Sequence, residues 1–152
     1  MNSKRAGRKY KTVDHLSDIG IEFYGDTLEE LFENAGKGMF SIISDLRFVK
    51  PLEKRSIRVI SEGVSYEDLL ILWLERLIYC YEVENILFSE FKLDKITRKN
   101  HKLLLKAEIS GEKINLKRHE IRVSIKAPTY HQLEIKKGNK DYNWKGRVIF
   151  DV

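Results

Sequence analysis

The chain has 152 residues, of which 42% are hydrophobic and 34% are charged, and its formal net charge is +5. This length and composition predict one globular domain with a sizeable core, and no apolar run reaches the roughly 18–20 residues that a membrane helix needs. The N-terminus is basic but lacks the apolar segment of a secretory signal, so we expect a cytoplasmic protein with no membrane partner.

The excess positive charge lies at the N-terminus. Five basic residues and no acidic residue occur among the first eleven positions, and the basic residues beyond them balance the 23 acidic ones. We therefore interpret residues 1–9 as a basic flexible tail and residues 10–152 as a single domain. Such a tail is either solvated or in contact with phosphate groups, for example those of tRNA.

The first half of the chain predicts two short strands and two helices. Residues 10–13 and 19–24 have strand character, and Thr27 with Glu30 forms a capping box before a helix over residues 28–44. A short strand over residues 56–61 follows. Ser65 then offers a cap for a second helix over residues 66–84, whose nearly all-round apolarity predicts that other elements cover it.

From residue 86 onward the apolar period changes to two, which is typical of strands. The predicted strands cover residues 86–97, 102–110, 121–137 and 144–152, and polar or glycine-containing turns separate them. This order lacks the regular alternation of a doubly wound sheet. We expect an α+β fold with a mainly antiparallel β-sheet packed with two α-helices.

Few residues suggest chemistry. The sequence contains no glycine-rich phosphate loop, no nucleophile elbow and no CxxC motif, and the single cysteine, Cys80, lies within an apolar pattern and is expected in the core. His119 and His131 have no adjacent serine or cysteine nucleophile. We therefore expect both histidines to form structural hydrogen bonds rather than to act as general bases.

Acidic residues occur near both ends of the predicted domain. Asp14, His15 and Asp18 cluster in DHLSD, and Asp151 precedes Val152 and its carboxylate. If the last strand lies beside the first, these oxygens would form an acidic site that suits a hard divalent cation. The alternative is that Asp18 caps a turn and that Asp14 and Asp151 are ordinary surface acids.

The sequence resembles the archease family. The resemblance runs through DHLSDIGIEFYGDTLEELFENAGKGMF, YEDLLILWLERLIY followed by LFSEF, KAPTYHQLEI, and WKGRVIFDV. It implies an archease-like fold and a non-enzymatic activator of the tRNA-splicing RNA ligase, which joins a 3′-phosphate or 2′,3′-cyclic phosphate end to a 5′-hydroxyl end. Such an activator promotes guanylylation of the ligase's histidine and multiple turnover.

The resemblance also implies a site for a divalent metal, in the first place calcium. The matching ligands are Asp18, Asp151 and Val152, with Asp14 and His15 as additional ligands or as residues that support the ligands. Two other functions stay open from the residues alone. One is an RNA-binding or chaperone-like module for tRNA-processing or modification enzymes, and the other is a metal-dependent hydrolase that uses Asp14, His15, Asp18 and Asp151.

Overall fold

The computed structural model describes residues 9–14, 18–63 and 65–152, with the backbone alone at positions 13 and 14. Of the predicted tail, only Lys9 lies within the described residues. The helices are α1 (Leu28–Ile43) and α2 (Tyr66–Glu84), with a 3-10 turn at Leu46–Phe48. The strands are β1 (Tyr10–Asp14), β2 (Asp18–Gly25), β3 (Glu53–Ser61), β4 (Ile86–Leu93), β5 (Thr97–Lys99), β6 (Lys102–Lys113), β7 (Ala127–Lys137) and β8 (Trp144–Asp151).

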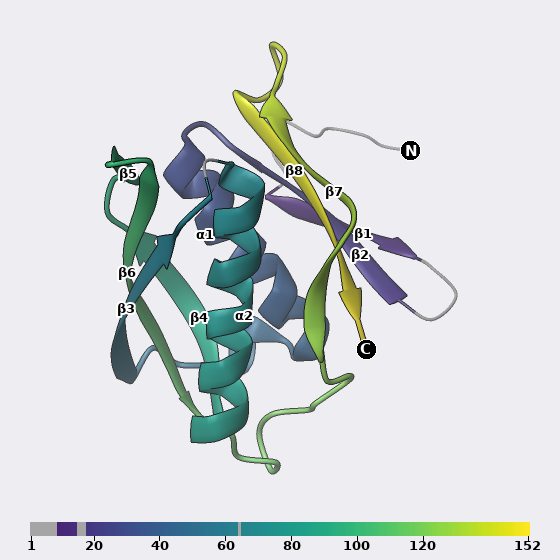
Figure 1. Cartoon of the computed structure of the whole chain (residues 1–152). Coiled ribbons are helices and arrows are strands. Elements are labelled where there is room, and N and C mark those ends of the chain that lie inside the picture. The colour runs from purple at the N-terminus through teal and green to yellow at the C-terminus, as the bar shows by residue number, and fades with distance from the viewer. Residues whose placement is uncertain (1–8, 15–17, 64) are drawn as a thin grey trace.

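The strands form two antiparallel sheets, and the two helices lie between them (Figure 1). One sheet has the order β1-β2-β8-β7, and the other has the order β3-β6-β4, with β5 paired to β6. Helix α1 packs against β2 and β4, and α2 packs against β7 and β3, so each helix contacts both sheets. The predicted α+β class is confirmed, but the strands divide into two sheets instead of forming one.

Both helices begin at the predicted caps. The Thr27 hydroxyl accepts a hydrogen bond from the Glu30 N–H at 3.0 Å, and the Ser65 hydroxyl accepts one from the Asp68 N–H at 3.1 Å. Helix α2 ends at Asn85, whose φ of 59° is the left-handed conformation that commonly terminates helices. Local sequence signals are therefore sufficient to locate these helix ends.

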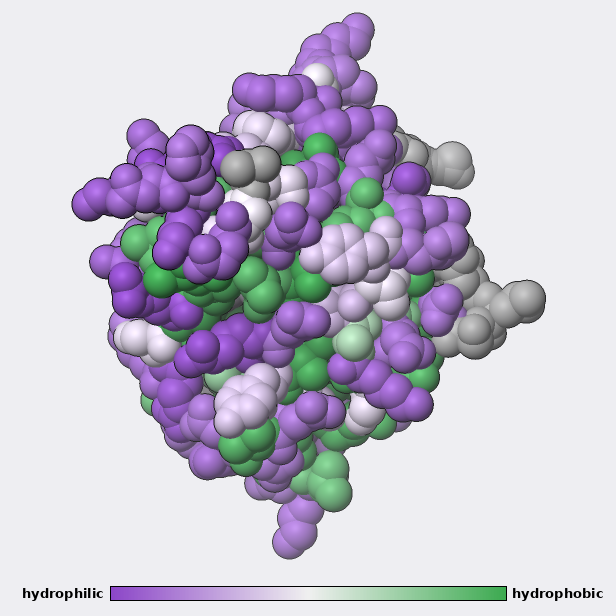
Figure 2. All heavy atoms as spheres, viewed as in Figure 1, coloured by the Kyte–Doolittle hydropathy of each residue, from purple (hydrophilic) through white to green (hydrophobic). Residues whose placement is uncertain are grey.

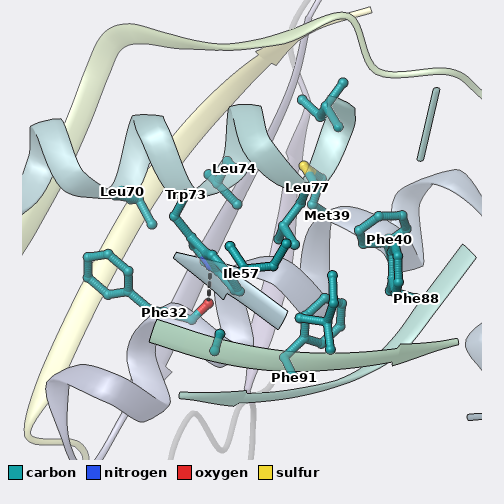
Figure 3. Close-up of a cluster of buried hydrophobic side chains, with 14 of the residues drawn as sticks. Phe32, Met39, Phe40, Ile57, Leu70, Trp73, Leu74, Leu77, Phe88 and Phe91 are labelled. Atoms are coloured by element: carbon teal, nitrogen blue, oxygen red, sulfur yellow. Dashed lines mark hydrogen bonds between the residues drawn. The ribbon is translucent and has the colours of Figure 1, made fainter. Parts of the chain in front are cut away.

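Helix α2 contributes the centre of the core. Leu70, Trp73, Leu74 and Leu77 point from α2 toward α1 and the β3-β6-β4 sheet (Figure 3). The Trp73 indole N–H donates to the Phe32 carbonyl of α1 at 3.0 Å, and its ring meets Phe91 edge-on at 6.5 Å between centroids. The apolar character of α2 on nearly all sides follows from its position between two sheets.

Two of the predicted strands are shorter than expected. The strand predicted over residues 86–97 ends at Leu93, because the Leu93 and Ile96 N–H groups donate to the Glu33 and Glu29 carboxylates of α1 instead of to a strand. Glu33 thus occupies a donor at the end of β4, and Glu29 occupies one in the segment that follows. The donor in β4 would otherwise be open to pairing with another chain.

The strand predicted over residues 121–137 begins only at Ala127, so the prediction was wrong for residues 121–126. This segment crosses from one end of α1 to β8 without joining a sheet. The Arg122 N–H donates to the Ile43 carbonyl at 2.8 Å, and the Lys126 N–H donates to the Asp151 carbonyl at 2.8 Å. Burial of Ile125 produces the apolar alternation in the sequence without any ladder pairing.

The β2–β8 pairing includes one position where only glycine fits. Gly146 lies opposite Phe23, and a Cβ at position 146 would come within 2.3 Å of the buried Phe23 ring. Gly146→Ala should therefore lower the free energy of unfolding by about 1–3 kcal/mol, the usual cost of overpacking. Chemical denaturation measures this change.

A double-variant cycle provides the control for this prediction. Phe23→Leu removes the ring atoms that the new methyl group would meet. The combined variant should then be less destabilised than the sum of the two single variants. Simple additivity would show that the clash is not the cause.

Candidate functional site

The register of β2 and β8 places two acidic residues directly opposite each other at one end of the sheet. Asp18 opens β2, Asp151 closes β8, and the two are Cα partners in the antiparallel ladder. Residues in such positions have Cβ atoms about 4.5–5.5 Å apart. We call this pair the acidic tip.

Strand alternation fixes the face on which the acidic tip lies. Ile21 and Phe23 of β2 and Val148 and Phe150 of β8 belong to the core, so the residues at alternate positions, including Asp18 and Asp151, face away from it. Asp18 is half-buried and Asp151 is exposed. Two carboxylates can therefore approach the same solvent-accessible point from neighbouring strands.

The structure describes the other predicted ligands to different extents. Val152 follows Asp151 and packs partly against the core. The backbone of Asp14 lies at the end of β1 opposite Ile19, one strand away from the acidic tip, but its side chain is outside the described residues, as is all of His15. The structure therefore brings Asp18 and Asp151 together and leaves the contributions of Asp14 and His15 as predictions.

The acidic site was conditional on the last strand lying beside the first, and the structure places the last strand one position farther along the sheet. Strand β8 lies between β2 and β7, so it contacts the second strand of the chain and not the first. This arrangement places the strand that begins with Asp18 directly beside the strand that ends with Asp151. The acidic tip depends on this order, because a neighbouring β1 would have separated Asp18 from Asp151.

Farther along the same face, Glu22 lies among several basic side chains. The Glu22 carboxylate has Lys11 at 3.4 Å, Lys145 at 3.8 Å and Arg147 at 4.0 Å. Burial raises the pKa of Glu22, but the hydrogen bond from Tyr24 and the charges of Lys145 and Lys11 outweigh burial and lower it overall. Among the described residues, Asp18 and Asp151 form no ion pair with a basic side chain.

The donor set at the acidic tip fits a hard divalent cation. Calcium and magnesium prefer oxygen ligands, and like charges directly opposite in a sheet destabilise it unless a cation or donor lies between them. In the part of the chain that the structure describes, no group of three or more His, Cys, Asp or Glu side chains is arranged to hold a metal. A complete site would thus need oxygen ligands in addition to Asp18 and Asp151.

The structural role predicted for His119 is confirmed. Its ring is buried, Nδ1 accepts from the Asn115 N–H at 3.0 Å, and Nε2 lies 2.9 Å from the Phe48 carbonyl, to which it donates in the tautomer that this pattern requires. His131 is exposed and lies at the irregularity in β7 between Thr129 and Glu134. Neither histidine adjoins the acidic tip in sequence or strand register.

Sequence reasoning missed the acid beside His119. The Glu112 carboxylate is buried, accepts from the Lys50 N–H at 2.7 Å, and pairs with Arg118 and His119. Burial raises the pKa of Glu112, but the hydrogen bonds from Lys50, Arg118 and His119 outweigh burial and lower it overall. Glu112 lies on the outward phase of β6, so the sequence carries no signal for its burial.

This cluster predicts a pH-dependent stability difference. Glu112→Gln should lower the free energy of unfolding at pH 7 by about 2–3 kcal/mol, below the usual cost of breaking a buried pair because Arg118 is partly exposed. Since the pKa of Glu112 is lower in the folded state, its contribution is complete above the unfolded value of about 4.3 and disappears as the pH falls through the folded value. Denaturation of both proteins from pH 7 to pH 3 measures the difference.

The exposed Glu108 of the same strand provides the control for this series. Glu108→Gln should change stability by no more than about 0.5 kcal/mol. A difference between wild type and Glu112→Gln that stays constant down to pH 3 would contradict the assignment of the stabilising charge to Glu112.

No helix in the described ranges is both long and apolar enough to cross a membrane.

Residues 10–152 match the model of the Archease protein family (MTH1598/TM1083). The chain is 40% identical to Protein archease of Methanosarcina barkeri, with 96% of this chain and 97% of that protein covered. It is 36% identical to Protein archease of Pyrococcus furiosus, with 95% and 99% covered.

The fold also matches a solved structure. The solution structure of Methanobacterium thermoautotrophicum protein 1598 aligns with a TM-score of 0.80 and 38% sequence identity, and the match covers 95% of this chain and 99% of that one. The matched region of the sequence includes both β2 and β8, the strands that carry the acidic tip.

Proposed function

Because the chain belongs to the archease family, we propose that it is a non-enzymatic activator of the tRNA-splicing RNA ligase in the cytoplasm. In this role it promotes guanylylation of the ligase's histidine and sustains multiple turnover in joining 3′-phosphate or 2′,3′-cyclic phosphate ends to 5′-hydroxyl ends. Family membership supports an RNA ligase as the partner. The register-opposed pair Asp18 and Asp151 is the observation that carries the proposal to a site on this chain.

The proposed metal site consists of Asp18, Asp151 and the Val152 carboxylate, with Asp14 and His15 as additional or supporting groups. A divalent cation, in the first place calcium, would neutralise the repulsion between the two facing carboxylates. The cation supplies positive charge that can act on phosphate oxygens. The chain's own contribution is to hold the two carboxylates in fixed register at the end of paired strands.

Two mechanisms of activation differ in what the acidic tip does. In the first, Asp18 and Asp151 would hold a metal ion near the ligase's reacting phosphates, where its charge would lower the barrier. In the second, the protein binds one conformation of the ligase and increases the population of that conformation. Removal of the tip charges abolishes activation in the first mechanism. In the second, activation depends only on the surface that contacts the ligase.

Multiple-turnover ligation tests the proposed function. A purified cognate ligase is supplied with GTP, divalent metal and an RNA that carries a 3′-phosphate and a 5′-hydroxyl, with and without a catalytic amount of this protein. We expect ligated RNA to exceed one equivalent of ligase only when the protein is present, and labelled GTP to show faster guanylylation. If a ligase of verified activity is indifferent to the protein, the proposed function is wrong, and tRNA binding becomes the next hypothesis to test.

A further inference from the structure

Three large apolar side chains are exposed on two segments, residues 48–52 and the turn at residue 116, that hydrogen bonds to Glu112 and His119 hold together. Phe48, Leu52 and Leu116 are 56%, 68% and 77% exposed, and Leu116 is the most exposed large hydrophobic residue in the described chain. Figure 2 shows hydrophobic residues reaching the surface at the lower end of the molecule, where the loop before β7 projects in Figure 1. We call these three side chains the apolar end surface.

The turn that carries Leu116 is held by four hydrogen bonds that involve Asn115. The Asn115 side chain accepts from the Lys117 N–H at 3.0 Å, and its carbonyl accepts from the Arg118 and His119 N–H groups at 2.9 and 2.7 Å. The Asn115 N–H in turn donates to the buried His119 ring. Leu116 is therefore fixed in an exposed position and does not belong to a loosely held loop.

The same polar cluster holds the backbone segment that carries the other two side chains. The Phe48 carbonyl accepts from His119, and the Lys50 N–H between Phe48 and Leu52 donates to Glu112. The Leu52 N–H donates to the Gly111 carbonyl at 2.9 Å. Buried polar groups thus form a rigid base beneath three exposed apolar groups, and such pre-organisation reduces the entropy lost on binding.

The surroundings of this surface are positively charged. Leu52 and Leu116 line one open hollow of 670 Å³, together with three basic residues, Lys113, Lys117 and Arg118, and two acidic ones, Glu53 and Glu112, that pair with arginines. Within the described residues, Lys50 and Lys117 form no ion pair with a carboxylate, and Lys113 donates only to the Glu84 backbone carbonyl at 3.0 Å. The nearby Arg47, Arg55 and Arg118 are each paired with a carboxylate. A partner that matches this surface would present an apolar recess rimmed by carboxylates.

The apolar end surface is physically connected to the acidic tip. Residues 120–126 run from the Leu116 turn to β8. The Ser44 hydroxyl donates a hydrogen bond to the Glu120 carbonyl, and the Lys126 N–H donates one to the Asp151 carbonyl. Lys126 follows His119 by seven positions, so these two residues are at most about 25 Å apart. One partner protein can therefore contact both features at once.

We propose that the apolar end surface is the docking site for the RNA ligase and that docking there brings the acidic tip to the ligase. This inference rests on the proposed function. In the complex, the three apolar side chains enter a recess on the ligase. Lysines of this chain that form no ion pair face carboxylates on the ligase. Docking and activation are then separate properties, because different residues on this chain carry them.

Affinity and stimulation measured in parallel test the proposal. The variant Phe48→Ser/Leu52→Ser/Leu116→Ser should bind the cognate ligase at least tenfold more weakly by calorimetry. Its stimulation of ligation should approach the wild-type maximum only at correspondingly higher protein concentration. Lys117→Glu should also weaken binding, and the wild-type affinity should fall as salt rises. Ile60→Ser changes an exposed aliphatic residue on the outer face of the β3-β6-β4 sheet and should change neither property.

Folding and function have separate controls. Thermal unfolding of the triple variant should stay within a few degrees of wild type, since all three side chains are exposed. Asp18→Asn/Asp151→Asn should retain most of the affinity and lose stimulation. Wild-type affinity in the triple variant, with wild-type stimulation intact, would overturn the docking site and leave the proposed function standing. No stimulation by the wild-type protein would overturn the proposed function and this inference with it.

Discussion

The Asp151→Asn variant should bind calcium at least tenfold more weakly than wild type and should lose most of its stimulation of the RNA ligase. The reason is the register of β2 and β8, which places the Asp151 carboxylate directly opposite that of Asp18. An amide of the same shape removes one of the two facing charges, and calcium affinity depends strongly on the number of charged oxygen ligands. Isothermal titration calorimetry measures the affinity, and multiple-turnover ligation measures the stimulation.

Three further variants make this prediction specific. Asp18→Asn should have a similar effect, because it removes the facing charge. Deletion of Asp151 and Val152 should abolish tight calcium binding and leave most of the fold intact. Glu134→Gln, an acid on β7 that already pairs with Lys136 and Arg147, should leave calcium affinity unchanged. Unchanged calcium affinity after the deletion would rule out the proposed metal site.

Replacement of Trp73 with alanine should lower the free energy of unfolding by about 3–5 kcal/mol, the usual cost of removing a large aromatic side chain from a core. Trp73 is fully buried, meets Phe91 edge-on and bonds to the Phe32 carbonyl, so it connects α2 to both α1 and the β3-β6-β4 sheet. For a domain of this size, that loss corresponds to a melting temperature lower by about 6–20 °C. Calorimetry or denaturant titration provides the measurement.

Two matched variants separate the contributions of volume and hydrogen bonding. Trp73→Phe keeps most of the buried ring and loses the N–H donor, so it should cost about 1–2 kcal/mol. Tyr79→Ala removes an aromatic ring from the exposed side of the same helix and should change stability by about 0.5 kcal/mol or less. Equal losses for Trp73→Ala and Tyr79→Ala would show that Trp73 is not central to the core.

Local features of this fold could be predicted from the sequence, and features that depend on distant pairing could not. Thr27 and Ser65 determine the starts of both helices through hydrogen bonds within three residues, so their effect is visible in a short window. The division into two sheets depends on which strands meet across long separations. Alternation within one strand carries no information on its neighbours.

The same distinction holds for the candidate site. Asp18 and Asp151 could be identified as residues, but their alignment required β8 to lie beside β2, which no local pattern specifies. Burial of Glu112 was also unpredictable, because residues that follow β6 in sequence fold back and supply Arg118 and His119. The alternation at residues 121–126 predicted a strand because burial of Ile125 has the same sequence pattern whether or not the backbone pairs.

The central position of β8 in its sheet has a consequence for the order of folding. During synthesis the β3-β6-β4 sheet can assemble from residues 53–113, which are close together in sequence, whereas β2 and β7 must wait for β8 before either gains its inner neighbour. The contacts between β2 and β8 join distant parts of the sequence and so form slowly, and unpaired edges are prone to aggregation in the meantime. The two carboxylates of the acidic tip therefore meet only in one of the last steps of folding.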